Sequence, residues 1–365
     1  MADETKSALH LKSGCASPRR DANRARGTRQ REVLSPVQII QGIRSGDRSL
    51  LAKAITLIES SRPEDRRAAE QVIENCLSAT GNSIRVGVTG MPGAGKSSLI
   101  EALGKYLLTE RGEKVAVLTI DPSSQLSGGS ILGDKTRMPF LSSSEMAFIR
   151  PSPSRGVHGG VARRTPEAIL LCESAGYGNI FVETVGVGQS ESSIRSLVDF
   201  VLIVTIPGAG DELQSIKRGV MEIADLVAVN KADAENSNAA ERARTDAENA
   251  LRLLPISGSG WSPRAITCSA HAGRGIADIW SCVLDYVGLA KANGWFDRAR
   301  REQSRLSLQE ELAQGLLQMF RADPVIQHRT GELERQVSSG QVTTTKAARE
   351  LLDLFASRAG SERAS

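Results

Sequence analysis

The chain has 365 residues, of which 40% are hydrophobic and 24% charged, and its formal net charge is +4. This length suffices for one sizeable α/β domain with additional elements. No apolar run approaches the roughly 20 residues that are needed to cross a bilayer. We therefore expect no membrane segment.

Much of the excess positive charge lies near the N-terminus, in Lys12, Arg19, Arg20, Arg24, Arg26, Arg29 and Arg31. We expect residues 1–35 to form a disordered basic leader, because they are polar and poor in aromatic residues. A nucleic-acid contact is disfavoured, since no aromatic side chains for base stacking are interleaved. The leader lacks the apolar core of a secretory signal, and its acidic residues Asp3, Glu4 and Asp21 argue against a mitochondrial transit peptide. We expect a cytoplasmic protein.

The cysteines and histidines are too dispersed to suggest a dedicated zinc or nickel site. The five cysteines contain no C-x-x-C pair, and the four histidines are equally scattered; they are Cys15, Cys76, Cys172, Cys268, Cys282, His10, His158, His271 and His328. Reduced thiols are the simplest interpretation.

Residues 36–80 have helical apolar spacing without strand signals, as in Ile39, Ile40 and Ile43 and again in Leu51, Ala54, Ile55 and Ile58. This segment is expected to form an N-terminal helical arm. It carries no chemistry of its own, so packing against the following domain or a partner is its expected role.

The pattern G-x-x-x-x-G-K-[ST] follows an apolar run at residues 84–89 and precedes a helical pattern. This order of strand, glycine loop and helix is typical of a phosphate-binding loop. The loop N–H groups and the helix dipole would bind phosphate, Lys96 would contact the β- and γ-phosphates, and Ser97 would ligate Mg²⁺. The alternative is a glycine-rich turn that binds nothing. The expected nucleotide contacts are Gly90, Met91, Pro92, Gly93, Ala94, Gly95, Lys96, Ser97 and Ser98.

A second apolar strand, residues 114–120, ends at Asp121, which places this carboxylate at the same sheet edge as the loop. The polar segment 122–150, which includes Asp134, is expected to be a long loop that senses the nucleotide; a plain surface loop is the alternative. A further strand at residues 177–182 ends at Glu183. Gly186 follows three residues later, which is the layout of a second switch, with the carboxylate at the Mg²⁺ shell.

Buried strands are also expected at residues 199–206, 225–229 and 264–268, giving a mostly parallel sheet of six strands. The second of these runs into the sequence Asn230-Lys231-Ala232-Asp233. Asp233 can accept hydrogen bonds from N1–H and the amine of guanine, Lys231 can cover the ring, and Asn230 can tie this loop to the phosphate loop. GTP is therefore favoured over ATP. After the last strand, the backbone N–H groups of Ser269 and Ala270, with His271 beside them, are expected to read the guanine O6.

Beyond Gly294 the chain changes to long amphipathic helices. An apolar stripe must be buried. It can fold back on the domain, but we favour dimerisation or partner binding. The expected organisation is a leader at 1–35, a helical arm at 36–80, a P-loop domain at 81–292 and a C-terminal helical dimerisation arm at 293–365. The stripes are Leu306, Leu308, Leu312, Leu316 and Phe320, and then Ala347, Leu351, Leu352 and Phe355.

With these motifs in place, the chain resembles the methylmalonyl-CoA mutase-associated GTPases, the MeaB/MMAA family, some of which carry the ArgK transport-kinase name. The most specific segments are residues 90–97, 121–124, 183–191, 207–219 and 230–233. The resemblance implies a SIMIBI-class P-loop GTPase that hydrolyses GTP to GDP with Mg²⁺. It also implies a homodimeric chaperone that gates adenosylcobalamin loading and protects an acyl-CoA mutase.

Carried over to this sequence, the resemblance implies that Lys96, Asp121 and Glu183 are catalytic. Ser97, Asp121, Asp134 and Glu183 would hold the metal, and Asp134, Gln189, Gln214 and Lys217 would couple the switches to the partner.

Three other functions stay open. A metal-insertion GTPase for urease or hydrogenase would need Cys/His clusters, and a kinase acting on a transport protein conflicts with the guanine signal. A nucleotide-locked dimeric scaffold without turnover is the non-enzymatic alternative.

Overall fold

A computed structural model describes most of the chain beyond its N-terminal segment. The described residues are 34–60, 62–121, 136–153, 164–184, 194–208, 218–233, 236–255 and 257–361. The chain divides into two units, Met1–Ser35 and Pro36–Ser365. The predicted leader therefore lies almost entirely outside the described residues, and all the described helices and strands belong to the second unit.

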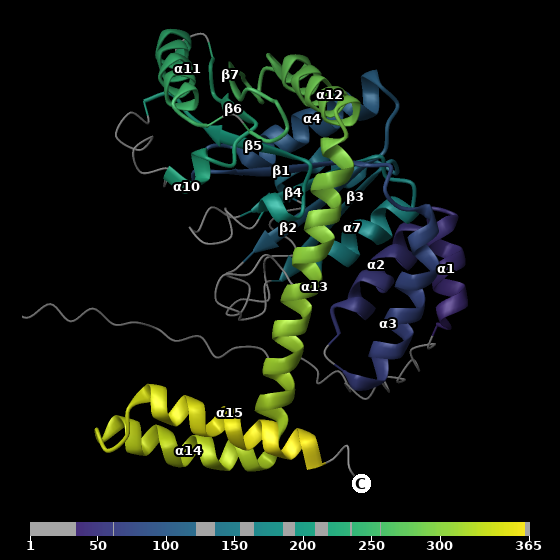
Figure 1. The fold of residues 1–365 in the computed structure, drawn as a ribbon. Helices are drawn as coiled ribbons and strands as arrows, with labels where there is room; N and C mark the ends of the chain where they lie inside the picture. The colour runs from purple at the N-terminus through teal and green to yellow at the C-terminus, as the bar shows by residue number, and fades with distance from the viewer. Residues whose placement is uncertain are drawn as a thin grey trace, which may run out of the picture. The chain divides into compact units, whose positions relative to one another are not determined.

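The second unit is built on a parallel sheet with the strand order β3-β2-β4-β1-β5-β6-β7 (Figure 1). Every strand pair in it is parallel. The predicted α/β fold with a P-loop sheet is confirmed. The strands are β1 (Ile84–Gly90), β2 (Val115–Asp121), β3 (Ala147–Pro153), β4 (Asn179–Thr184), β5 (Phe200–Thr205), β6 (Leu226–Val229) and β7 (Arg264–Thr267).

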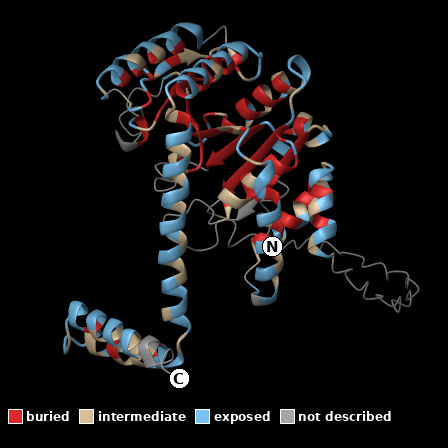
Figure 2. Ribbon diagram, turned by 45° about the vertical axis from the view of Figure 1, so that its right-hand side comes forward, coloured by how far each residue is buried: buried red, intermediate tan, exposed pale blue. Residues whose placement is uncertain are grey.

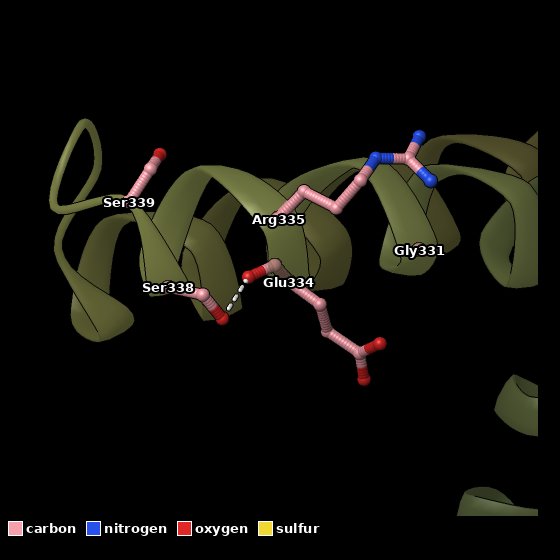
Figure 3. Close-up of a pocket in the computed structure, with 5 residues that line it drawn as sticks. All are labelled: Gly331, Glu334, Arg335, Ser338 and Ser339. Atoms are coloured by element: carbon pink, nitrogen blue, oxygen red, sulfur yellow. Dashed lines mark hydrogen bonds between the residues drawn. The ribbon is translucent and has the colours of Figure 1, made fainter.

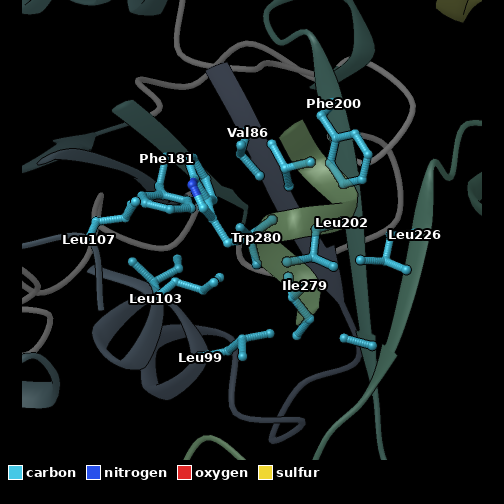
Figure 4. Packing of buried hydrophobic residues seen from close by; sticks show 14 of the residues in the cluster. Val86, Leu99, Leu103, Leu107, Phe181, Phe200, Leu202, Leu226, Ile279 and Trp280 are labelled. Atoms are coloured by element: carbon cyan, nitrogen blue, oxygen red, sulfur yellow. The ribbon is translucent and has the colours of Figure 1, made fainter. Parts of the chain in front are cut away.

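The central strands are buried along their length, as Figure 2 shows in red. One face packs against α4 (Lys96–Glu110) and α12 (Ile276–Ala292). In this core the rings of Phe181 and Trp280 lie 6.3 Å apart, among the leucines and isoleucines drawn in Figure 4. Strands covered on both faces need continuous apolar runs, which is why their sequences predicted them well.

Strand β3 was not predicted. The sequence predicts a polar loop over residues 122–150, but residues 139–143 form the short helix α6 (Pro139–Ser143) and β3 follows it. Only the stretch 122–135 lies outside the described residues. β3 pairs with β2 alone and contains Pro151 and Pro153. An edge strand tolerates prolines, whereas in sequence they argue against a strand.

Three helices precede the sheet and pack on α7 (Thr165–Ser174). They are α1 (Pro36–Arg44), α2 (Arg48–Ile58) and α3 (Pro63–Cys76), followed by the 3₁₀ turn η1 (Leu77–Ala79). The carboxylate of Asp47 caps α2 by accepting from the N–H groups of Ser49 and Leu50. Arg48 and Arg150 fasten this arm to the region of β3, through the carbonyl of Ser144 (2.8 Å) and the carboxylate of Glu59.

The remaining described elements of the domain connect the strands. They are η2 (Ile194–Ser196), α10 (Arg218–Met221) and α11 (Ser237–Arg252). In the described residues α10 ends at Met221, three residues before the helix end expected from the sequence.

The chain ends in α13 (Trp295–Ala322), α14 (Pro324–Ser338) and α15 (Thr344–Ser361). Helices α14 and α15 pair through Arg329 with Glu350, and the rings of Phe320 and Phe355 lie 5.3 Å apart. The second predicted stripe is therefore partly satisfied within the chain. The leucines of the α13 stripe remain exposed, as in Leu308 and Leu312 at 60% and 57%. No helix among the described residues combines the length and the apolar character that crossing a bilayer requires.

An ion-pair network anchors the start of α13 to the amino ends of the strands. The guanidinium of Arg300 donates to both carboxylate oxygens of Asp199, at 2.9 and 2.8 Å, and to the carbonyls of Gly81 and Ser83, each at 2.6 Å. Beside it, Arg85 contacts the buried carboxylate of Glu173 at 2.9 Å. A bidentate arginine–carboxylate pair is among the stronger polar contacts in proteins.

Glu173 stays charged in this network. Burial raises the pKa of its carboxyl, but Arg85 and the hydrogen bonds from Ser83 and Gly81 outweigh burial and bring the pKa below its ordinary value of 4.5. A carboxyl with a lowered folded-state pKa stabilises the fold above the unfolded pKa, and that contribution is lost as the pH falls through the folded pKa.

The variant Glu173→Gln tests this contribution. It should lower the free energy of unfolding at pH 7 by about 3 kcal/mol, because Arg85 loses its buried partner. The loss of stability should shrink as the pH falls below 4.5, the ordinary pKa of a glutamate carboxyl, because Glu173 itself then becomes protonated. Urea unfolding at several pH values measures it. Glu70→Gln in the exposed pair Arg66–Glu70 is the matched control and should change stability by less than about 0.5 kcal/mol. A penalty for Glu173→Gln that does not vary with pH would contradict the assignment.

Candidate nucleotide-binding site

The loop between β1 and α4 has the backbone that a phosphate cradle requires. Gly90 has a φ of +130°, and a Cβ there would lie 2.1 Å from the carbonyl oxygen of Val204 on β5. Gly95 has a φ of +88°, and a Cβ there would lie 2.6 Å from Nδ2 of Asn230. Side chains at these two positions would collide with neighbouring loops and strands, so both positions need glycine. Helix α4 begins directly after Gly95 and directs its N-terminal dipole at the loop.

Lys96 is folded back into this loop. Its ammonium donates to the carbonyls of Gly90 at 2.8 Å and Met91 at 3.0 Å, and the residue is only 8% exposed. The charge therefore lies inside the loop, beside the N–H groups that would receive a phosphate. Pro92, Gly93 and Ser98, also expected to contact the nucleotide, are exposed around it.

The end of β4 meets the start of α4. Glu183 pairs in register with Val88 on one side and Thr119 on the other, and its Oε1 accepts from the hydroxyl of Ser97 at 2.8 Å. Next to it the buried hydroxyls of Thr184 and Thr89 are joined at 2.9 Å. The two predicted metal-binding residues Ser97 and Glu183 are thus in direct contact.

The loops after β6 and β7 converge on the phosphate loop through Asn230. Its Nδ2 donates to the carbonyl of Ala94 at 2.9 Å, and its Oδ1 accepts from the backbone N–H of Ala270 at 3.0 Å. The residue is 2% exposed. This amide makes the link between loops that the sequence analysis expected of Asn230.

Asp233 is oriented by a neighbour that sequence reasoning did not assign this role. The hydroxyl of Ser269 donates to Oδ1 of Asp233 at 2.6 Å and itself accepts from the N–H of Ala272 at 3.0 Å. Lys231 has a φ of +60°, a left-handed conformation found at no other non-glycine residue that the structure describes. Such strain in a loop is characteristic of functional sites.

The N–H groups expected to read the guanine O6 are engaged within the protein. Ser269 donates to the carbonyl of Arg274 at 3.0 Å, and Ala270 donates to Asn230. His271 lies next to them and is exposed. Reading of O6 by Ala270 would require its N–H to turn away from Asn230 or to be shared.

Several predicted site residues cannot be placed. The backbone of Asp121 ends β2 at the same sheet edge as Glu183, but its side chain lies outside the described residues. The other predicted site residues outside the described part are Asp134, Gly186, Gln189, Gln214 and Lys217.

The residues present at this edge fit Mg²⁺. A serine hydroxyl and a carboxylate are hard oxygen donors, and Mg²⁺ is commonly held by one or two protein oxygens together with substrate phosphates and water. Within the described residues no cluster of three or more His, Cys, Asp or Glu side chains could hold a metal by itself.

A hollow also lies on α14. It is lined by Gly331, Glu334, Arg335, Ser338 and Ser339 (Figure 3). Its one drawn hydrogen bond, from the Ser338 hydroxyl to the carbonyl of Glu334 at 2.8 Å, is internal to the helix. This hollow lies on one helix of the C-terminal arm and has no convergent polar groups of the kind found at the sheet edge.

Comparison with known proteins agrees with the nucleotide site. Residues 51–325 match the model of the family described as methylmalonyl-CoA mutase-associated GTPase MeaB. The chain belongs to the MeaB family. It is therefore a GTP hydrolase, and it belongs to a family associated by name with methylmalonyl-CoA mutase.

Three individual proteins illustrate the MeaB family similarity. A probable GTPase of Mycobacterium tuberculosis is 45% identical over 312 residues, covering 86% of this chain and 93% of that protein. The mouse methylmalonic aciduria type A homologue, a mitochondrial protein, is 41% identical over 331 residues, covering 88% and 80%. A crystal structure described as LAO/AO transport system kinase superposes with a TM-score of 0.69 at 36% identity. The superposition covers 88% of this chain and 97% of that one.

Replacing Asn230 by alanine tests the convergence of the loops. The carbonyl of Ala94 and the N–H of Ala270 would each lose a buried partner, which costs about 1–3 kcal/mol. If the loops are organised for the nucleotide, GDP affinity should fall roughly 5- to 150-fold. Titration with fluorescent GDP measures this. Asn238→Ala, at an exposed position of α11, is the matched control and should bind like the wild type. Unchanged affinity of a folded Asn230→Ala protein would show that this bridge does not shape the site.

Proposed function

We propose that this protein is a chaperone of an adenosylcobalamin-dependent acyl-CoA mutase, such as methylmalonyl-CoA mutase, and that it uses GTP hydrolysis to gate cofactor loading and protect the enzyme. The mutase in the family's name supports the choice of client. The observation that carries the nucleotide part is the convergence of three loops, in which Asn230 joins Ala94 to Ala270 beside the contact of Ser97 with Glu183.

In this proposal water attacks the γ-phosphate in line, and GDP and phosphate leave. Lys96 would exchange its two loop carbonyls for the β- and γ-phosphate oxygens, and the loop N–H groups would hold the phosphate chain. Asp121 or Glu183 would orient the attacking water. Asp233, fixed by Ser269, would accept the hydrogen bonds that guanine offers and adenine lacks.

Ser97 and Glu183 would hold Mg²⁺, together with Asp121 and Asp134. When bound, Mg²⁺ would neutralise charge on the phosphate oxygens. No arginine is assigned to this charge, so intrinsic turnover is expected to be slow and to rise when a partner repositions the switches. The partner's signal would pass through Asp134, Gln189, Gln214 and Lys217. A cytoplasmic location stays a prediction.

The variant Lys96→Ala tests the proposed site. Loss of a charge that stabilises the transition state should slow GTP hydrolysis by about 10²-fold or more. The rate of phosphate release at saturating GTP with Mg²⁺ measures this loss. A parallel assay with ATP as competitor shows whether the site selects GTP. Lys105→Ala removes the same residue type from the exposed side of α4 and should hydrolyse GTP within about twofold of the wild type. Hydrolysis by Lys96→Ala at the wild-type rate would overturn the assignment.

The same pair of variants tests the chaperone proposal. Purified methylmalonyl-CoA mutase with adenosylcobalamin should lose activity during turnover more slowly when the wild-type protein and GTP are present. Lys105→Ala should protect equally, and Lys96→Ala should not. Absence of a complex with the mutase in both the GDP state and a non-hydrolysable GTP state, together with no protection, would contradict the proposed client.

We also propose a homodimer formed through the exposed stripe of α13, because Leu308, Leu312 and Leu316 lie four residues apart on one helix face. Light scattering should give a dimer for the wild type and a monomer for Leu312→Glu, whose charge would be buried in the interface. The control Leu253→Glu, at a leucine that is 87% exposed on the sheet domain, should remain dimeric. A monomeric wild type would contradict the proposal.

A further inference from the structure

The segment that follows the second switch lies directly on the phosphate-loop strand. β4 ends at Thr184, and the described chain resumes at Ile194. A Cβ at Gly87 of β1 would lie 2.6 Å from Cδ1 of Ile194 and 2.8 Å from Cγ2 of Val198. Both side chains are buried. Ile194 and Val198 therefore pack so closely on β1 that no side chain could stand at Gly87.

One side chain of α13 holds this segment by its backbone. The Nε2 of Gln303 donates to the carbonyl of Arg195 at 3.1 Å and to the carbonyl of Val198 at 2.8 Å. One helical turn earlier, the guanidinium of Arg300 donates two hydrogen bonds to the carboxylate of Asp199, which is the next residue along the segment. The connection between the second switch and β5 is thus fastened to the first turns of α13.

The side-chain amide of Gln303 has one polar atom without a hydrogen bond among the described residues. Oε1 of Gln303 is buried and accepts no hydrogen bond from any residue that the structure describes. The two bonds of Nε2 come from one amide group, so a rotation of that amide would release both carbonyls together.

We propose that Gln303 is a positioning residue for GTP hydrolysis, assisted by Arg300. By holding residues 195–199 against β1, the strand that leads into the phosphate loop, it supports the nucleotide site and transmits the state of that site to α13. This inference rests on the proposed switch role of Glu183. Glu183 contacts Ser97 at one end of the connection, and Gln303 holds the other end. Neither Gln303 nor Arg300 contacts the phosphate loop in the hydrogen bonds that the structure shows.

Single-turnover hydrolysis of GTP by the full chain tests the proposal. Gln303→Ala should hydrolyse GTP about 3- to 10-fold more slowly, in the range expected for residues that modulate coupling. KM for GTP and the affinity for GDP should stay within about twofold, because the nucleotide contacts are intact. Gln309→Ala, an exposed glutamine on the same helix, is the matched control.

Hydrogen exchange provides a readout that a purely structural anchor would not change. In the wild type, peptides covering residues 194–199 and 300–312 should exchange differently with GDP and with a non-hydrolysable GTP analogue. In Gln303→Ala the difference at 300–312 should disappear, while binding of both nucleotides persists.

Two results would overturn the inference. One is a wild-type rate for Gln303→Ala with the nucleotide-dependent exchange at α13 retained. The other is an equal loss in Gln309→Ala, which would indicate a general effect of the helix. Glu183→Gln separates this inference from the proposed function. If that variant hydrolyses GTP normally, the switch assignment fails; if it is slow while Gln303→Ala is not, only the role of Gln303 fails.

Discussion

The structure depends on one buried amide. Asn230 donates to Ala94 in the phosphate loop and accepts from Ala270 in the loop after β7, so a single side chain holds together the ends of three strands. Both polar atoms of the amide are used, at a residue that is almost wholly buried. A buried amide whose nitrogen and oxygen are both hydrogen-bonded fixes geometry strictly, because any displacement leaves costly unpaired groups. The loops of the nucleotide site are thereby held together by hydrogen bonds of the protein itself.

The two ends of the strands have different roles. The proposed catalytic and metal-binding residues Lys96, Ser97 and Glu183 lie at the carboxyl ends, in agreement with the general position of ligands in open parallel sheets. The ion pairs of Arg300 with Asp199 and of Arg85 with Glu173 lie at the amino ends. Helix α13 starts at the amino ends, and its Glu311 lies 3.8 Å from Arg164 at the start of α7. Helix α13 therefore contacts both the amino ends of the strands and the start of α7.

The sequence predicted what is local and missed what depends on distant residues. Six strands were predicted from continuous apolar runs, but β3 was hidden by its prolines and by its edge position. The phosphate loop and the sequence Asn230-Lys231-Ala232-Asp233 are contiguous motifs, so their residue types alone predict their chemistry. Two hydrogen bonds join segments that only the fold brings together. One runs from the hydroxyl of Ser269 to Asp233, and the other from the amide of Gln303 to the carbonyl of Arg195. No periodicity in the sequence signals such contacts.

The prolines that concealed β3 have a consequence for association. A strand at a sheet border offers a row of unpaired backbone groups to which a foreign strand can add. Pro151 and Pro153 have no N–H to offer an incoming chain. Arg150, beside them, is paired with Glu59, the residue that follows α2. This border is consequently a poor template for strand addition, and growth of the sheet into larger aggregates is discouraged on that side.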